Sequence, residues 1–197
     1  MAVLSDGDIR RELEREDGLR ITPLLDENIQ PASVDLTLGD QFAEMDPWYG
    51  DTHGYIDPAW IKANRAKLRG IPSAAPSRIH GGFMLQPNRL VLATTRERVK
   101  IPNNLVGRVE GKSSLGRIGL FIHVTAGYID PGFVGQITLD LYSVAQHPII
   151  LRPGMPFCQL SLIVMSSPAL RPYGHKELGS TYQDQVGVTG SGRGSVE

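Results

Sequence analysis

Cysteine is almost absent from this 197-residue chain, in which Cys158 is the single cysteine. One thiol cannot close a disulfide within the chain or supply a cysteine-rich zinc site, so both kinds of stabilising centre are excluded. Because Cys158 lies in an apolar run, a buried structural thiol is a better interpretation than a nucleophile. The chain should therefore depend on its hydrophobic core, and it suits a reducing cytoplasm.

An excess of charge is lacking as well. The chain has 20 Lys and Arg against 21 Asp and Glu, for a formal net charge of −1. Proteins that bind nucleic acid or membrane surfaces usually carry a basic excess, so neither partner is expected. A small anionic ligand such as a nucleotide needs only a few local cations.

Long apolar runs are missing too. No span approaches the roughly 20 apolar residues of a membrane helix. The first residues include Asp6, Asp8, Arg10 and Arg11, where a signal peptide would have an apolar stretch. We therefore expect a cytoplasmic protein without membrane segments.

Extended helical patterns are scarce, whereas short apolar and alternating runs separated by turn sequences are common. Strands are expected at 34–38 (closing at Gly39), 82–85, 90–95, 106–110, 120–124, 135–142, 149–151 and 157–165. One short helix should begin at Ser5, with Asp8 three residues on, and end at about Arg15. The pattern predicts a mainly β fold of the distorted barrel or jelly-roll type, and it argues against a parallel α/β fold.

The length suits one domain spanning 1–197. Residues 46–82 interrupt the strand pattern with Trp48, Tyr49, Tyr55 and Trp60 and with a helical pattern over 58–68, so we interpret them as an insertion packed on the barrel. The last residues, about 184–197, are rich in Gly, Ser, Thr, Val and Gln and are expected to form a flexible tail.

Polar chemistry gathers in two neighbouring stretches. The first, Gly111 to Arg117, sets Lys112, two hydroxyls and Arg117 among glycines, which suits a phosphate but equally suits a polar surface turn. In the second, Asp130 lies in a turn, where aspartate is common for local reasons. Asp140 lies in the next strand on the face shared with Thr138 and Gln136, where a carboxylate is usually only solvated.

The segments GKSSLGR and HVTAGYIDPGFVGQITLD resemble the dCTP deaminase family, which belongs to the superfamily of the trimeric dUTPases. LSDGDIRREL, QPASVDLTLGD, LRPGMPFCQL, RPY and YQDQ follow the family's order. The resemblance implies a dUTPase-like barrel, a homotrimer with sites between subunits, and hydrolytic deamination of dCTP to dUTP in deoxyuridylate supply for dTTP synthesis. Ala126, Gly127 and Tyr128 are similar to the bifunctional members, which continue to dUMP and pyrophosphate.

The resemblance also implies roles for individual residues. The catalytic residues would be Asp140, Ser113 and Arg117. The substrate would be bound by Lys112, Ser113, Ser114, Leu115, Gly116, Arg117, His123, Ala126, Tyr128, Asp130, Thr138, Leu139, Asp140, Gln159, Tyr173 and Gln185. The tail would close as a lid over bound nucleotide. Mg²⁺ would come with the triphosphate, dTTP could act as an inhibitor, and no zinc is expected because the H-x-E and P-C-x-x-C signatures are absent.

Three positions depart from the family pattern. Asp140 stands where the family carries a glutamate that acts as general base and acid, Ser143 where it has asparagine, and Thr181 where it has lysine. Alone, His123 would be interpreted as a satisfied core histidine. Two other functions remain open at this point: a dUTPase without deaminase activity, and a regulatory module that binds dCTP or dTTP without turnover.

Overall fold

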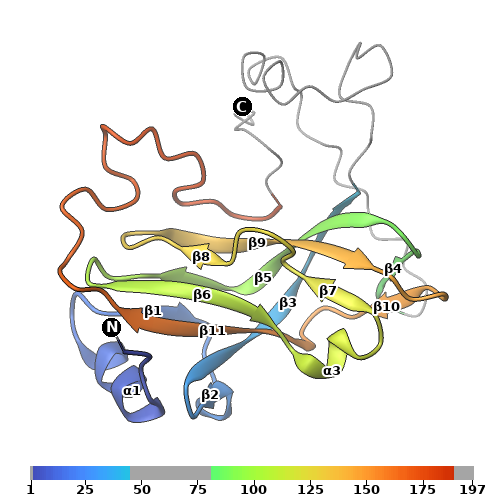
Figure 1. The fold of residues 1–197 in the computed structure, drawn as a ribbon, viewed down its shortest axis with the longest axis horizontal. Coiled ribbons are helices and arrows are strands. Elements are labelled where there is room, and N and C mark those ends of the chain that lie inside the picture. Colours follow the sequence, from blue (N-terminus) through green and yellow to red (C-terminus); the bar gives the residue numbers. More distant parts are fainter. Residues whose placement is uncertain (1, 45–80, 189–197) are drawn as a thin grey trace.

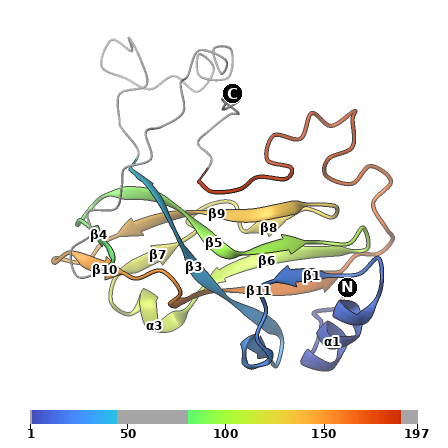
Figure 2. The ribbon, with the colours of Figure 1, turned by 180° about the vertical axis from the view of Figure 1, so that it is seen from behind.

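The computed structural model describes residues 2–44 and 81–188, drawn in colour in Figure 1 and, from behind, in Figure 2. The aromatic residues and the helix expected between 46 and 80 lie outside these residues, as does the tail after residue 188. The elements are α1 Asp6–Glu14, β1 Arg20–Thr22, the 3-10 helix η1 Asp26–Asn28, β2 Ile29–Gln30, β3 Ser33–Glu44, β4 Phe83–Leu85, β5 Leu90–Lys100, β6 Leu105–Gly111, α3 Ser113–Gly116, β7 Leu120–Ile122, β8 Tyr128–Ile129, β9 Val134–Ser143, β10 Ile149–Leu151 and β11 Pro156–Val164.

The described strands form one large, curled sheet and one small sheet. The large sheet runs in the order β7-β9-β5-β3-β11-β6-β8, with β1 added to β5 and β2 to β3, and these neighbouring strands pair antiparallel. β10 and β4 form the second sheet. Both views show the sheet folding over on itself as part of a barrel. The mainly β, barrel-like prediction is confirmed.

The core follows from alternation along the strands. In β9 the side chains of Ile137, Leu139 and Leu141 are buried, while Thr138 and Asp140 between them are half-buried on the other face. A strand with one apolar face packs that face inward, because successive side chains point to opposite sides. The predicted placement of Asp140 beside Thr138 is confirmed.

The predicted first helix is also present. The Ser5 side chain accepts a hydrogen bond from the Asp8 backbone N–H at 3.3 Å, and α1 runs on to Glu14 with Ile9 fully buried. This contact satisfies one of the N–H groups that a helix leaves free at its start. The helix thus covers one end of the barrel (Figure 1).

The prediction that the strand beginning near Val34 closes at Gly39 is wrong. β3 continues to Glu44, with an irregular register against β5 between Leu38 and Phe42. A Cβ at Gly39 would lie 2.8 Å from Thr94 Oγ1, so the glycine allows β3 to pass very close to β5. Here glycine marks a bulge rather than a strand end.

Two buried side chains of the barrel wall, Glu97 and Cys158, carry ionisable groups. Glu97 is 2% exposed, and its carboxylate accepts hydrogen bonds from the Thr37 N–H at 2.9 Å and the Thr37 hydroxyl at 2.6 Å. Cys158 is fully buried; burial raises the pKa of its thiol, and the nearby Glu97 and Asp35 carboxylates raise it further. The interpretation of Cys158 as a buried thiol is confirmed.

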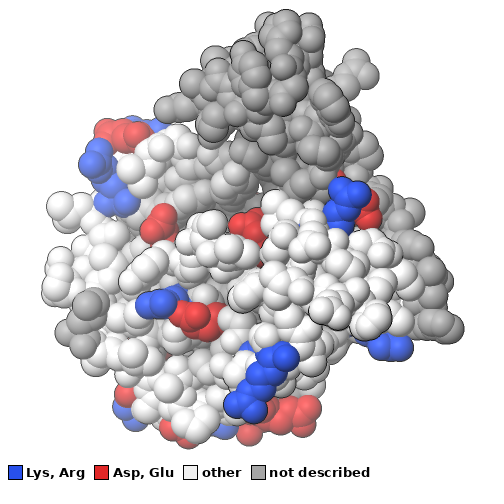
Figure 3. Space-filling view, turned by 45° about the vertical axis from the view of Figure 1, so that its right-hand side comes forward, with Lys and Arg blue, Asp and Glu red and all other residues white. Residues whose placement is uncertain are grey.

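The surface agrees with the balanced composition. In Figure 3 positive and negative side chains occur in small groups on the visible face, and much of that face is uncharged. In the part of the chain that the structure describes, no helix is both long enough and apolar enough to cross a bilayer.

Candidate active site

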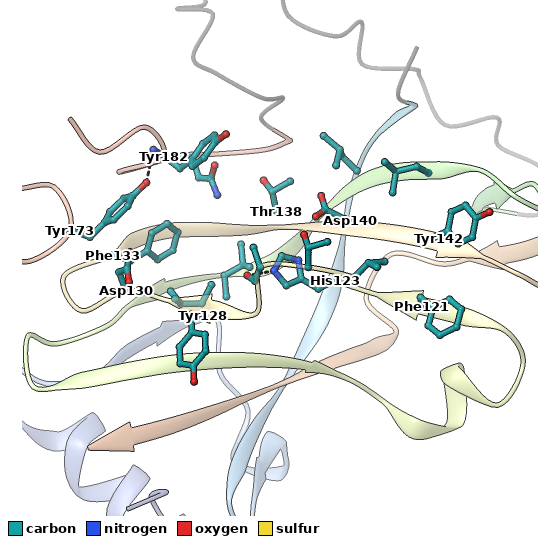
Figure 4. A pocket seen from close by; sticks show the side chains of 18 residues that line it. Phe121, His123, Tyr128, Asp130, Phe133, Thr138, Asp140, Tyr142, Tyr173 and Tyr182 are labelled. Atoms are coloured by element: carbon teal, nitrogen blue, oxygen red, sulfur yellow. Dashed lines mark hydrogen bonds between the residues drawn. The ribbon is translucent and has the colours of Figure 1, made fainter. Parts of the chain in front are cut away.

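A cavity of about 890 Å³ opens over the half-buried face of β9. Its wall is completed by β7, β8, the turn after β8 and the segment of residues 182–188, which we call the C-terminal strap (Figure 4). Eight predicted site residues line it, namely His123, Ala126, Tyr128, Asp130, Thr138, Asp140, Tyr173 and Gln185. Residues up to 62 positions apart in the sequence, from His123 to Gln185, are therefore brought to one cavity.

Thr138 and Asp140 lie on the same side of β9 in Figure 4. The Thr138 hydroxyl oxygen is buried and has no hydrogen-bond partner. Asp140 is opposite Leu92 of β5, and no Lys or Arg among the described residues forms an ion pair with it. A carboxylate held beside apolar groups without a cation is available to accept a proton from a bound molecule.

The outer edge of β9 has a gap at Thr138. The Asp140 carbonyl accepts from the His123 N–H at 3.1 Å, so β7 and its extension cover this edge from Asp140 onward. The Gln136 N–H donates to the Gln185 carbonyl at 3.1 Å, so the strap covers the edge up to Gln136. Backbone groups two residues apart on an antiparallel strand point to the same edge, which directs the Thr138 N–H and C=O into the gap.

His123 borders this gap in an unusual backbone conformation. Its φ is 60°, in the left-handed region, and this is where β7 ends. One ring nitrogen, Nε2, contacts the Ala126 carbonyl, while the other, Nδ1, is buried without a partner. The interpretation of His123 as a satisfied core histidine is therefore wrong, because one ring nitrogen remains open for a ligand.

Asp130 lies at the far end of the cavity in the expected turn. The turn is closed by the Phe133 N–H, which donates to the Asp130 backbone carbonyl at 3.1 Å, and by Gly132 with φ 89°. The carboxylate itself makes no hydrogen bond to any described residue, so local turn chemistry does not account for it. Tyr128, on β8, is 63% exposed, and its ring lies 5.9 Å from the Arg108 guanidinium carbon.

The strap contributes two further groups. The Tyr182 N–H donates to the Tyr173 hydroxyl at 2.9 Å, which leaves the O–H of Tyr173 free to donate elsewhere. Gln185 Nε2 donates to the Gln136 carbonyl at 2.6 Å, while Gln185 Oε1 is buried and has no partner. Three unpartnered polar atoms, on His123, Thr138 and Gln185, thus belong to residues that line one cavity. Such clustering is typical of a site that binds a polar ligand.

The remaining predicted residues lie outside the cavity. Leu139 is fully buried in the core, so only its backbone could contact a ligand. The other residues belong to the loop group, which we define as Lys112, Ser113, Ser114, Leu115, Gly116, Arg117 and Gln159; none of them lines the cavity. Lys112 Nζ forms an ion pair with Asp35 at 2.6 Å, and Gln159 Nε2 donates to the same carboxylate at 3.3 Å. The structure thus separates the predicted site into two groups within one chain.

Several cavity residues were not predicted. Tyr142 and Phe121 are aromatic side chains at one end, Leu90 and Leu92 form the apolar wall from β5, and Tyr182 lies in the strap. The period-two pattern from Thr138 and Asp140 would have found Tyr142. The others come from separate elements and required the fold.

A metal ion has no dedicated position in the described ranges, 2–44 and 81–188, where no three His, Cys, Asp or Glu side chains are grouped to hold one. The cavity contains the two carboxylates of Asp130 and Asp140. Two carboxylates are too few to hold a cation by protein ligands alone. They suit a cation that arrives already bound to phosphate oxygens.

Comparison with known proteins identifies the family. Residues 3–165 match the model of dCTP deaminase-like proteins. The chain belongs to the dCTP deaminase-like family. It is 44% identical over 188 residues to a protein of Methanosphaera stadtmanae named dCTP deaminase, dUMP-forming, a match that covers 95% of this chain and 91% of the relative. A Corynebacterium glutamicum protein of the same name is 47% identical over 189 residues, covering 96% and 95%.

A solved structure shows the same fold for the family. The 2'-deoxycytidine 5'-triphosphate deaminase of Agrobacterium tumefaciens matches with a TM-score of 0.58 and 23% identity. The match covers 83% of this chain, which spans about half (48%) of that longer chain. The resemblance to the dCTP deaminase family and the dUTPase-like fold that it implied are confirmed.

Proposed function

We propose that this protein deaminates dCTP and carries the product through to dUMP. Hydrolysis of dCTP gives dUTP and ammonia, and a second water then cleaves dUTP to dUMP and pyrophosphate. The observation that carries the proposal is the open edge of β9 at Thr138 beside the unpaired carboxylate of Asp140. Relatives named dCTP deaminase, dUMP-forming, at 44% to 47% identity support the substrate and the product.

The open strand edge would recognise the base. A backbone N–H and C=O on one residue offer a donor and an acceptor side by side, which complements a pyrimidine edge with an acceptor next to an amino group. The Thr138 hydroxyl and His123 Nδ1, both buried without partners, could satisfy further polar atoms of the ring. Binding the ligand would thus remove polar groups that are costly to leave unpaired.

Asp140 would activate the water that attacks C4 of cytosine. Its carboxylate takes a proton from the water and passes it to N3 of the ring as the hydroxide adds to C4. The proton of the new C4 hydroxyl then moves through the same carboxylate to the amino group, which leaves as ammonia. Ser113 and Arg117 would assist at this centre, as the family resemblance implies. Because the aspartate is one methylene shorter than the family glutamate, the base must approach the strand more closely for the same water to be activated.

Asp130 would orient the deoxyribose. Its carboxylate lacks a hydrogen-bond partner among the described residues and lines the cavity, so it can accept from the 3'-hydroxyl. Tyr128, Ala126 and the neighbouring backbone would pack against the sugar. In the second step, water positioned near Asp130 and the phosphates would attack dUTP.

The phosphates require cations that the described residues of one chain do not bring to the cavity. None of the described residues that line it is Lys or Arg. We propose a homotrimer in which the loop group of a neighbouring copy supplies Lys112, Ser113, Ser114, Arg117 and Gln159, while Tyr173 donates its O–H and Gln185 presents its amide from the strap. Mg²⁺ would enter on the triphosphate and reduce its charge. dTTP, which shares the sugar and phosphates, could inhibit at the same site.

The proposal also covers the location, the pathway and the domain organisation of the chain. The chain would act in the cytoplasm, in deoxyuridylate supply for dTTP synthesis. Residues 1–197 would form a single domain, with 46–82 as an insertion and 184–197 as the lid.

The test is an incubation of the purified protein with dCTP and Mg²⁺, followed by chromatography of the nucleotides and an ammonia assay. Equal amounts of ammonia and dUMP, with little free dUTP, are expected. Pyrophosphate from added dUTP without ammonia from dCTP would mean a dUTPase alone. Nucleotide-dependent thermal stabilisation with no product would mean a sensor. Asp140→Asn serves as the inactive control, and Ser161→Ala, outside the site, as the active one.

A further inference from the structure

The C-terminal strap is held on its own chain by the first residues of β9. Gly135 and Gln185 form a parallel bridge, and the Asp184 N–H donates to the Val134 carbonyl at 2.8 Å. A Cβ at Gly135 would lie 3.1 Å from both the backbone N and O of Gln185, so the glycine allows this close approach. Arg98 forms an ion pair with Asp184 at 2.5 Å. The strap thus lies along β9 like a short extra strand (Figure 1).

Gln136 contacts the strap with both its backbone and its side chain. Its N–H donates to the Gln185 carbonyl at 3.1 Å, and its own carbonyl accepts from Gln185 Nε2 at 2.6 Å. Its side-chain Oε1 accepts from the Gly187 N–H at 2.7 Å. One residue of β9 therefore binds two residues of the strap.

The other end of the same side chain is bound to β5. Gln136 Nε2 donates to the Thr95 carbonyl at 3.0 Å and to the Arg96 carbonyl at 3.4 Å. These carbonyls lie where the register of β5 against β9 shifts, between Thr94 and Arg98. With both ends of its amide bonded, Gln136 has a fixed orientation, and so does the strap that it binds.

This contact determines two features of the cavity. It ends the covered part of the β9 edge at Gln136, which leaves the edge open two residues later at Thr138. It also holds Gln185, a residue that lines the cavity and whose Oε1 is buried without a partner. Gln136 itself is not among the residues that line the cavity, so we expect it to act through the strap.

We propose that Gln136 is a positioning residue that clamps the strap in place and so presents Gln185 to bound nucleotide. The proposal rests on the function proposed above for its substrate, dCTP. The clamp itself concerns the chain without ligand and can be measured separately.

The first test is hydrogen–deuterium exchange of the free, full-length protein. Gln136→Met keeps the length of the side chain and removes its hydrogen bonds, so the amides of 184–187 should exchange at least tenfold faster than in the wild type. Ser161→Ala is the matched control, because it removes a side-chain bond to a strand carbonyl far from the strap. Unchanged exchange in Gln136→Met would overturn the clamp.

The second test is steady-state kinetics with dCTP. Losing the ordered strap should raise KM by about tenfold and change kcat by less than about twofold, since the strap binds substrate and transition state alike. In a Gln185→Ala background the same Gln136→Met change should raise KM by less than about a further twofold, because Gln136 acts through Gln185. If the KM of the double variant instead rose by the product of the two single effects, Gln136 would act on the sheet and not through the strap.

A third variant approaches the clamp from the strap side. Gly187 has φ 75°, and a side chain there would press on the amide of Gln41, so Gly187→Ala should loosen the strap without altering β9. The same rise in KM is expected, with an unchanged melting temperature. If the wild-type protein turned over neither dCTP nor dUTP, the proposed function would fail, yet the exchange experiment would still decide whether Gln136 clamps the strap.

Discussion

The cavity and the loop group are opposites in chemistry. The cavity has two carboxylates, three unpartnered polar atoms and an open strand edge, but no Lys or Arg among its described lining residues. The loop group has Lys112, Arg117 and two exposed hydroxyls, but its residues do not line this cavity. A nucleoside triphosphate needs both kinds of surface, since its base is polar and neutral while its phosphates are strongly anionic. The difference supports the proposal above, in which one chain would hold two halves of different sites.

Each half also differs in how its charges are partnered. Lys112 is already paired with Asp35, whereas Arg117 is exposed and has no ion-pair partner among the described residues. Paired Lys112 stabilises the loop, and Arg117 remains available to a ligand. Predictions about these residues can therefore separate binding from stability.

The largest effect is expected at Asp140. Asp140→Asn removes the proton acceptor and should lower the rate of ammonia release by about a thousandfold, within the usual range for a general base. dCTP should still raise the melting temperature, because the loop group and the base edge are intact. A variant that keeps wild-type ammonia release would place the general base elsewhere. Asp140→Glu, which adds the missing methylene, should stay active.

A structural carboxylate provides the contrast to Asp140. Glu97→Ala would leave the N–H and hydroxyl of Thr37 unpaired in the interior and should lower the free energy of unfolding by about 2–4 kcal/mol. Urea denaturation measures this directly. Asp140→Asn should lower the free energy of unfolding by less than about 1 kcal/mol in the same experiment, since the Asp140 carboxylate has no partner to lose among the described residues. If both variants lost the same free energy of unfolding, the distinction between a structural carboxylate, Glu97, and a site carboxylate, Asp140, would be contradicted.

A moderate effect is expected at Arg117. Arg117→Ala should raise KM for dCTP on the order of tenfold to a hundredfold, the usual value of one charge-assisted contact. Its melting temperature should match the wild type, because the exposed guanidinium has no ion pair to lose among the described residues. Lys112→Met, by contrast, should lower both binding and stability, as Asp35 would lose its cation. Calorimetric melts alongside the kinetics distinguish the two.

The smallest effect on stability is expected at Thr138. Thr138→Val replaces a buried hydroxyl that has no partner, so the free energy of unfolding should stay the same or rise by up to about 1 kcal/mol. Binding of dCTP should weaken at the same time. A clear loss of stability would mean that this hydroxyl is already satisfied by the protein.

The sequence predicted those parts of the fold and site that depend on local pattern. Alternation placed Thr138 and Asp140 on one face of a strand, and the turn signal placed Asp130 correctly. The sequence could not predict that β3 continues beyond Gly39, because the cause is the close approach of Gly39 to Thr94 on β5, a strand distant in sequence. For the same reason it missed β8, the strap contacts of Gln136, and the left-handed backbone of His123.

The separation of the two groups was likewise invisible in the sequence. Asp130 and Arg117 are only 13 positions apart, yet Asp130 lines the cavity and Arg117 does not. The direction of each side chain depends on how β7, β8 and β9 pair, which is a tertiary property.

Mixing two impaired variants, assayed at a dCTP concentration well below the KM of Arg117→Ala, tests the central claim most directly. Asp140→Asn chains and Arg117→Ala chains, each with its own affinity tag, would be co-expressed and the mixed assemblies purified. If a cavity from one chain works with a loop group from its neighbour, purified mixed trimers should recover about a third of wild-type ammonia release, because one of the three sites in each mixed trimer has both halves intact. Mixed assemblies no more active than the parent variants would contradict a site shared between chains.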